Sequence, residues 1–236
     1  MRSGLRCTCW IAFALSAVSI VAPAHTVAEL EMIARSAVVR EVSMAAGLSL
    51  ASFYATAVPL TDLEERAKSG STAGIRLAAR TAMDILSDPL QLLVEQPAND
   101  LKELAISGVT SDVRLDAARA YYIKIREALT AARLTADAEG SESEELALAA
   151  GEALSGFYTS FEVMPAAELM EQAVGGTTPG LRTAAGLALG THLIRTSSLT
   201  EGEIVVKIME HTIVHTELAE AYMLLLAHRW REGGGA

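Results

Sequence analysis

Cysteine is nearly missing from this sequence. The 236 residues include two, Cys7 and Cys9, and both lie within the first 24 residues. The rest of the chain therefore cannot form a disulfide framework. Also missing are strand-like alternation, a Gly-rich phosphate loop, a nucleophile elbow and a linker long enough to separate domains. These absences favour an all-α, single-domain protein that is not an enzyme and uses no cofactor or metal.

Basic residues are scarce. The chain has 19 Lys and Arg against 29 Asp and Glu, a formal net charge of −10. Without the first 24 residues, which contain Arg2 and Arg6, the net charge is about −12. Phosphate groups would repel such a chain, so nucleic acid and anionic membrane surfaces are excluded as partners. Basic partners remain possible.

The N-terminal segment has the layout of a secretory signal peptide. Two arginines are followed by an apolar run from Trp10 to Val21 and by the small residues Ala22-Pro23-Ala24. The alternative is an uncleaved anchor, but the run is shorter than the roughly 20 residues that span a membrane. We therefore expect Met1–Ala24 to be cleaved, leaving a periplasmic or secreted protein without a membrane span.

One sequence motif occurs three times. It consists of a short apolar run at helical spacing, a Gly, a Thr two residues later, an Arg four residues beyond the Thr, and then small residues. The copies are Leu63–Ala79, Leu101–Ala117 and Leu169–Ala185. Gly after one helical pattern and Thr before the next are typical of a helix, a tight turn and a second helix. We expect Gly70 to adopt a left-handed conformation at the end of the first helix and Thr72 to cap the second.

A longer similarity covers the same motif. Ala45–Tyr54 matches Ala149–Tyr158, and Pro59–Ala79 matches Pro165–Ala185, with 16 of 31 positions identical. Pairs of small residues begin at Ala45, Ala78, Ala117, Ala149 and Ala184, in steps of 33, 39, 32 and 35 residues. One helical hairpin per repeat has this length. Residues 25–231 are expected to form about six stacked hairpins, followed by a flexible tail over 232–236.

Local signals place the helix boundaries. Capping boxes are expected at Thr61 with Glu64, Asp100 with Glu103, Ser141 with Glu144, and Thr200 with Glu203. Pro89 and Pro97 bracket a short inserted helix, which accounts for the longest of the repeat steps.

The motifs at residues 70–79, 108–118 and 176–185 resemble HEAT-like repeats, especially the short kind also found in phycobilisome-lyase-type proteins. The aspartate that usually precedes the arginine is present only as Asp112. The resemblance implies a right-handed α-superhelix used mainly for protein–protein contact. We do not expect the pigment chemistry of the lyases, because an exported chain without cysteine has nothing to support it.

Three arginines occupy one equivalent position in the repeats: Arg76, Arg114 and Arg182. They could form an anion-binding ladder on the surface. Alternatively, each pairs with an acidic residue or a helix C-terminal carbonyl of a neighbouring unit. Because the arginine recurs at the same position of each repeat, the second, structural role is favoured.

Histidine offers the other candidate chemistry. His211 and His215 have metal-binding spacing on an unbroken helix. A turn is expected near Thr212, however, and would separate the two rings, so the sequence predicts no metal site there. His192 falls on an apolar stripe and is expected to be a core histidine. His25 would become the N-terminal residue after cleavage, where an amine and an imidazole can chelate copper, but the enzymes that use this arrangement look like β-sandwiches, so no copper site is expected.

Other conspicuous residues are expected to be structural. The aromatic pairs Phe53-Tyr54, Tyr121-Tyr122 and Phe157-Tyr158 recur at related positions, which indicates packing between repeats with the hydroxyls at the edge. The acidic run Glu142, Glu144 and Glu145 fits a charged first helical turn.

Two functional hypotheses follow. The favoured one is an exported, non-catalytic helical-repeat scaffold that binds a protein or peptide through its concave groove. The alternative is a protein that binds a small ligand or metal through its C-terminal histidines.

Overall fold

The computed structural model describes residues 25–87, 89–160 and 164–232. These residues form thirteen α-helices and one 3-10 helix, with no strand among them, so the predicted all-α class is confirmed. No helix within these ranges is long and apolar enough to cross a membrane. The predicted signal peptide and residues 233–236 of the predicted tail lie outside the described residues. The last helix continues to Glu232, one residue into that predicted tail.

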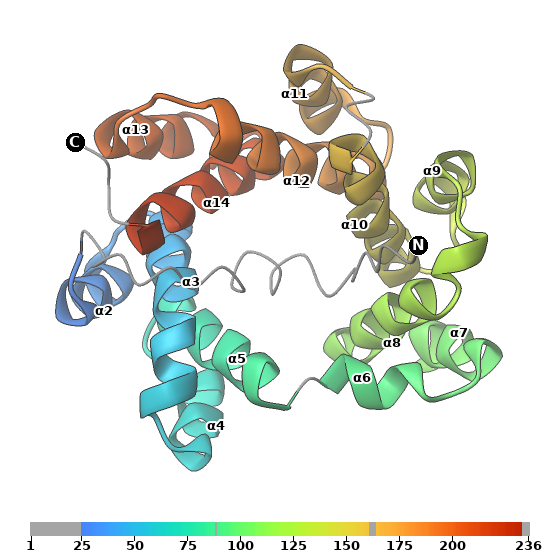
Figure 1. Ribbon diagram of the computed structural model, residues 1–236, viewed down its shortest axis with the longest axis horizontal. Coiled ribbons are helices and arrows are strands. Elements are labelled where there is room, and N and C mark those ends of the chain that lie inside the picture. The colour runs from blue at the N-terminus through green and yellow to red at the C-terminus, as the bar shows by residue number, and fades with distance from the viewer. Residues whose placement is uncertain (1–24, 88, 161–163, 233–236) are drawn as a thin grey trace, which may run out of the picture. The chain divides into compact units, whose positions relative to one another are not determined.

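The chain folds as two compact units, here called unit 1 and unit 2 (Figure 1). Unit 1 contains α2 (Val27–Ser36), α3 (Arg40–Ala57), α4 (Leu60–Ser69), α5 (Ala73–Ser87) and the end of α14 (Thr216–Glu232) from Leu226 onward. Unit 2 contains α6 (Pro89–Val94), α7 (Ala98–Ser107), α8 (Ser111–Lys124), η1 (Arg126–Ala128), α9 (Ala131–Gly140), α10 (Glu144–Ser160), α11 (Ala166–Gly175), α12 (Pro179–Thr196), α13 (Glu201–His211) and the first part of α14. The short inserted helix between Pro89 and Pro97 is present as α6.

Helices pair along the chain. In unit 1, α2 packs on α3 and α4 on α5; in unit 2, α7 packs on α8, α9 on α10, and α11 on α12. The first helix of each pair buries two apolar residues four positions apart. These residues are Leu30 and Ala34, Leu63 and Ala67, Leu101 and Ala105, Leu134 and Ala138, and Leu169 and Ala173. Such a narrow stripe suits a helix that covers one side of its partner and leaves its other faces in water.

The second helices approach one another closely. The α3–α5 crossing brings Gly47 against the backbone of Gly74, and the α10–α12 crossing brings Gly151 against the backbone of Gly180. A side chain at any of the four positions would collide with backbone atoms of the facing helix. Because the two crossings occupy matching positions, they account physically for the similarity between residues 45–79 and 149–185.

The turn glycines differ from expectation. Gly70, the C-cap of α4, has φ −52° and ψ 135°, so the left-handed conformation predicted for it is wrong. Gly108 and Gly176 have similar backbone angles. Glycine is needed instead because the turn is crowded: a Cβ on Gly176 would lie 2.6 Å from the Gln172 carbonyl oxygen and 2.9 Å from Cγ of Arg182.

One of the four expected capping boxes forms. Thr200 and Glu203 bond reciprocally at the start of α13. The other three predictions are wrong: α4 and α7 begin directly after Pro59 and Pro97, and α10 is capped by Ser143 because Ser141 ends α9. Proline holds the extended backbone that precedes a helix but has no side-chain acceptor, so the first N–H groups of α4 and α7 receive no side-chain cap.

Cap hydroxyls also join successive helix pairs. Thr178 Oγ1 accepts from the Leu181 N–H and donates to the Ala138 carbonyl at the end of α9, at 2.8 Å. Thr72 likewise donates to the Ala34 carbonyl at 2.6 Å. Thr72 and Thr178 therefore each satisfy the start of their own helix and the end of a helix in the preceding pair, whereas Thr110 caps only its own helix.

The Thr178→Val substitution keeps the side-chain shape and removes both hydrogen bonds. We expect it to lower the free energy of unfolding by about 1–2 kcal/mol, the usual cost of a lost helix cap. Chemical denaturation followed by circular dichroism would measure this. Thr191→Val is the matched control, because the Thr191 hydroxyl bonds only within α12, to the Leu187 carbonyl. Equal losses in the two variants would contradict the linking role of Thr178.

Candidate functional site

The three equivalent arginines have identical backbone partners. Each donates from Nη1 to the carbonyl of the glycine six residues before it, at 2.7 Å for Arg76 and 3.0 Å for both Arg114 and Arg182. These carbonyls lie at the C-terminal end of the preceding helix, where a cation is favoured. The glycine belongs to the same helix pair as the arginine, rather than to a neighbouring pair as expected.

Two of the arginines also reach a glutamate of the next helix pair. Arg114 donates from Nε and Nη2 to Glu145 Oε1 at 2.9 and 2.6 Å, and Arg182 donates from Nε to Glu217 at 2.9 Å. The Arg114 guanidinium holds the pKa of Glu145 below its usual range. The geometry therefore supports the structural role of these arginines. Glu144 and Glu145 lie in the first turn of α10, as predicted for the acidic run, whereas Glu142 precedes the helix.

One tyrosine of each aromatic pair is buried: Tyr54, Tyr122 and Tyr158. Tyr54 donates to Glu31 of the same helix pair at 2.8 Å, and the Arg66 guanidinium of the next pair lies 5.0 Å from its ring centre. Tyr122 of α8 donates to Asp137 of α9 at 3.2 Å. The Tyr54–Arg66 and Tyr122–Asp137 contacts join adjacent helix pairs, as the sequence predicted.

The histidines depart from expectation in two respects. His192 is partly exposed, so the prediction of a core histidine is wrong. A turn does follow His211, as expected, but it does not separate the pair: the ring centres of His211 and His215 are 6.0 Å apart. His25 lies elsewhere, in unit 1, with its ring centre 5.7 Å from that of Trp230.

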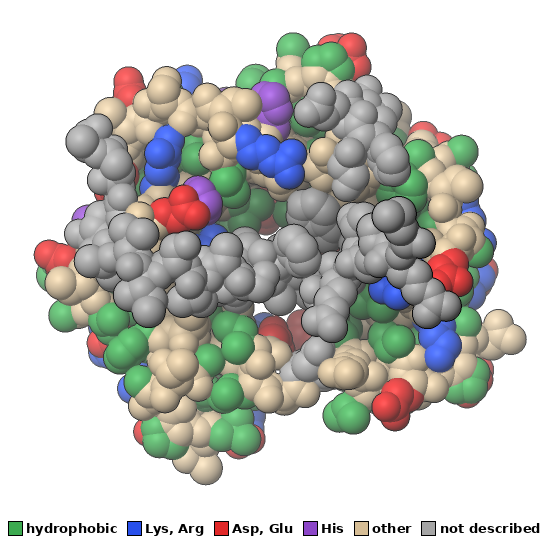
Figure 2. Space-filling model, in the orientation of Figure 1, with side chains coloured by type: hydrophobic (Ala, Val, Ile, Leu, Met, Phe, Trp, Pro, Cys, Tyr) green, Lys and Arg blue, Asp and Glu red, His purple; other side chains and the backbone are tan. Residues whose placement is uncertain are grey.

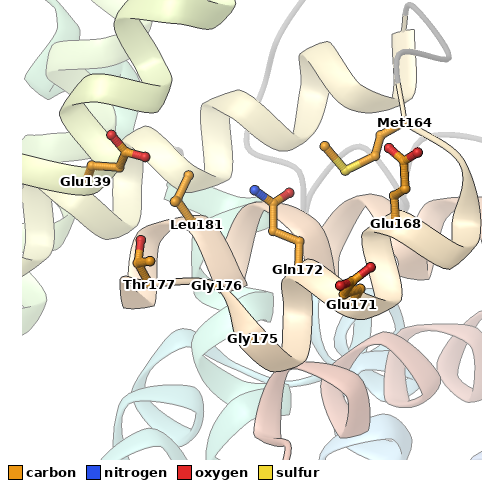
Figure 3. Close-up of a pocket in the computed structure, with 9 residues that line it drawn as sticks. All are labelled: Glu139, Met164, Glu168, Glu171, Gln172, Gly175, Gly176, Thr177 and Leu181. Atoms are coloured by element: carbon orange, nitrogen blue, oxygen red, sulfur yellow. The ribbon is translucent and has the colours of Figure 1, made fainter.

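Unit 2 has an open pocket of about 420 Å³ between α9 and α11 (Figure 3), here called the α9–α11 pocket. Its lining consists of Glu139, Met164, Glu168, Glu171, Gln172, Gly175, Gly176, Thr177 and Leu181. Glu139 is contributed by α9, whereas Glu168, Glu171 and Gln172 share one face of α11. The three glutamates give the pocket an acidic rim.

The pocket also contains an unused hydrogen-bond acceptor. The Gln172 side chain opposes the rise in the pKa of the buried Tyr158 hydroxyl that burial causes. The buried Oε1 of Gln172 has no partner among the described residues. Figure 3 shows this amide pointing into the space bounded by Leu181 and Met164. An acceptor left unpaired in this way favours a ligand that brings an N–H or O–H donor.

The combination of groups selects a particular chemistry. Carboxylates and an amide oxygen accept hydrogen bonds from ammonium or guanidinium groups, while Met164 and Leu181 provide apolar contact for an aliphatic stem. Lys and Arg side chains have both parts.

Only a weak signal for this pocket is present in the sequence. Glu168, Glu171 and Gln172 recur at helical spacing and so share a face. Glu139 is 29 residues before Glu168, and nothing in the sequence pattern pairs them.

Unit 1 exposes apolar side chains instead. Phe53 of α3 is 42% exposed, and Ile85 and Leu86 of α5 are 41% and 51% exposed. Hydrophobic side chains gather over these helices in Figure 2. Isolated exposed residues of this kind are common at protein surfaces, and no site is assigned to them.

Comparison with known proteins identifies no relative. No protein family, curated protein or solved structure matches the chain.

Proposed function

We propose that this chain is a non-catalytic helical-repeat scaffold that binds a basic segment of a protein or peptide partner in the α9–α11 pocket. The observation that carries the proposal is the acidic rim around an unpaired Gln172 oxygen. The acidic composition of the whole chain adds long-range attraction for such a partner.

The architecture proposed for the scaffold is a right-handed α-solenoid of about six HEAT-like hairpins. Support comes from the recurring Gly, Thr and Arg positions and their equivalent contacts in both units. We also propose that residues 1–24 direct export to the periplasm or outside the cell. The predicted binding through a concave groove of the solenoid stays a prediction. The pocket that supports the binding proposal lies between α9 and α11, the first helices of two pairs, and does not by itself indicate a groove.

The proposal can be tested with a panel of fluorescent Lys- and Arg-rich peptides and matched peptides carrying Glu instead. We expect the basic peptides alone to bind, with affinity falling as salt is raised. In the double variant Glu168→Gln/Glu171→Gln, affinity should fall about tenfold, since two charge-assisted hydrogen bonds are weakened. Fluorescence anisotropy at two salt concentrations gives both quantities.

The matched control is the double variant Glu64→Gln/Glu65→Gln on α4, which makes the same charge change at two exposed positions outside the pocket. Its affinity should stay within about twofold of the unmodified chain. If both double variants weaken binding equally, attraction is a property of the overall charge and the pocket is not the site. If no basic peptide binds, the proposed partner class is wrong.

A further inference from the structure

The turn between α13 and α14 returns the chain so that two histidines meet. The His215 N–H donates to the His211 carbonyl at 2.8 Å, and the Val214 N–H donates to the same carbonyl at 3.1 Å. This tight turn preserves the proximity that an unbroken helix would give. The ring centres lie 6.0 Å apart, with an angle of 52° between the rings.

Both imidazoles are available to a ligand. Neither ring makes a hydrogen bond or ion pair recorded for the described residues, and both side chains are partly exposed. His211 is stacked on Tyr222, with ring centres 5.9 Å apart and planes 8° from parallel. Stacking uses the face of the imidazole and leaves the nitrogens at its edge free.

The distance between the rings suits one shared ion. A metal lies about 2.1 Å from an imidazole nitrogen, so two rings around one tetrahedral ion have centres about 5 Å apart. The observed distance between the ring centres, 6.0 Å, is about 1 Å longer. Rotation of the partly exposed His215 side chain can bring the rings that much closer. No group of three or more His, Cys, Asp or Glu within the described ranges could hold a metal, so water would complete the coordination.

We propose that His211 and His215 form a two-histidine site for a divalent transition metal ion. Imidazole ligands with open water positions suit Cu²⁺, Ni²⁺ and Zn²⁺, whereas Mg²⁺ and Ca²⁺ prefer oxygen ligands. The site is independent of the α9–α11 pocket, and either proposal can fail without the other.

The test is titration of the full chain, without a histidine tag, with Cu²⁺ or Zn²⁺ alone, followed by calorimetry. We expect one ion per chain at this site, and each of the variants His211→Ala and His215→Ala should bind it about tenfold more weakly or worse, since each loses one of two protein ligands. His192→Ala and His25→Ala are the matched controls and should leave this binding unchanged. Circular dichroism would establish that each variant is folded.

A spectroscopic readout separates ligation from a structural effect. Electron paramagnetic resonance of the Cu²⁺ complex should show two nitrogen ligands, reduced to one in either variant. The proposal is overturned if the unmodified chain binds neither ion, if both variants keep its affinity, or if the nitrogen signal disappears only in His25→Ala.

Discussion

Gly74→Ala is expected to lower the free energy of unfolding by about 3 kcal/mol, the upper end of the usual cost of overpacking. A Cβ at this position would collide with the backbone carbonyl of Ser43 on α3. A flexible side chain could turn away, but a helical carbonyl cannot, so α3 and α5 must separate. The Gly74 N–H would then also lose its 3.1 Å hydrogen bond to the Ser43 hydroxyl. Urea denaturation followed by circular dichroism would measure the change.

The chain supplies a control for the same chemical change. Gly202 lies in the first turn of α13, is exposed, and has nothing within 4 Å of the position that a Cβ would take. Gly202→Ala should therefore be neutral or stabilise by up to about 0.5 kcal/mol, through the better helix propensity of alanine. A Gly74→Ala variant as stable as Gly202→Ala would show that the close crossing of α3 and α5 does not exist.

The parts of the fold that depend on local sequence could be predicted. Leu and Ala four positions apart identify the first helix of five pairs, and Thr followed four residues later by Arg identifies the start of α5, α8 and α12. The contact of Arg182 with the Gly176 carbonyl, six residues earlier, also lies within this range, although a partner in a neighbouring pair was expected. These signals work because both partners lie within a few residues of each other.

Predictions failed where the decisive contact was not local or where two local explanations competed. Gly70 could be explained by a left-handed turn, the commoner use of glycine after a helix, or by the passage of Arg76 over it. The turn after His211 was predicted correctly, but the conclusion that it separates His211 from His215 was wrong, because the chain folds back within four residues. The α9–α11 pocket requires two helix pairs to be placed side by side, which no periodicity specifies.

Arg114→Met is expected to lower the melting temperature by about 5 °C, because it leaves a largely buried carboxylate without its cation. Arg114 makes three hydrogen bonds: one to the Gly108 carbonyl within its own helix pair and two to Glu145 of the next pair. The Glu145 side chain is 10% exposed, so water replaces the lost partner poorly. Thermal unfolding followed by circular dichroism would measure the shift.

A second ion pair joins the same two helix pairs and provides the control. Lys102 Nζ lies 2.7 Å from Glu142 Oε1, but these side chains are 41% and 63% exposed. An exposed pair of this kind contributes little to stability, so Lys102→Met should change the melting temperature by about 1 °C or less. Similar shifts in the two variants would contradict the special role of the arginine. Arg114→Lys should recover only part of the loss, since one ammonium cannot reproduce the three bonds of the guanidinium.

The pH dependence of the difference in melting temperature between the unmodified chain and Arg114→Met tests whether the Glu145 charge causes it. The pKa of Glu145 is lowered in the folded chain, so its pairing with Arg114 stabilises the fold fully above the unfolded-state pKa, about 4.3. That stabilisation is lost as the pH falls through the lowered, folded-state pKa. The melting temperatures of the unmodified chain and Arg114→Met should therefore differ most near pH 7 and converge in acid, leaving the smaller loss from the Gly108 carbonyl. A difference that stays constant from pH 7 into the acid range would show that the arginine stabilises the fold through packing and the helix end, without a contribution from the Glu145 charge.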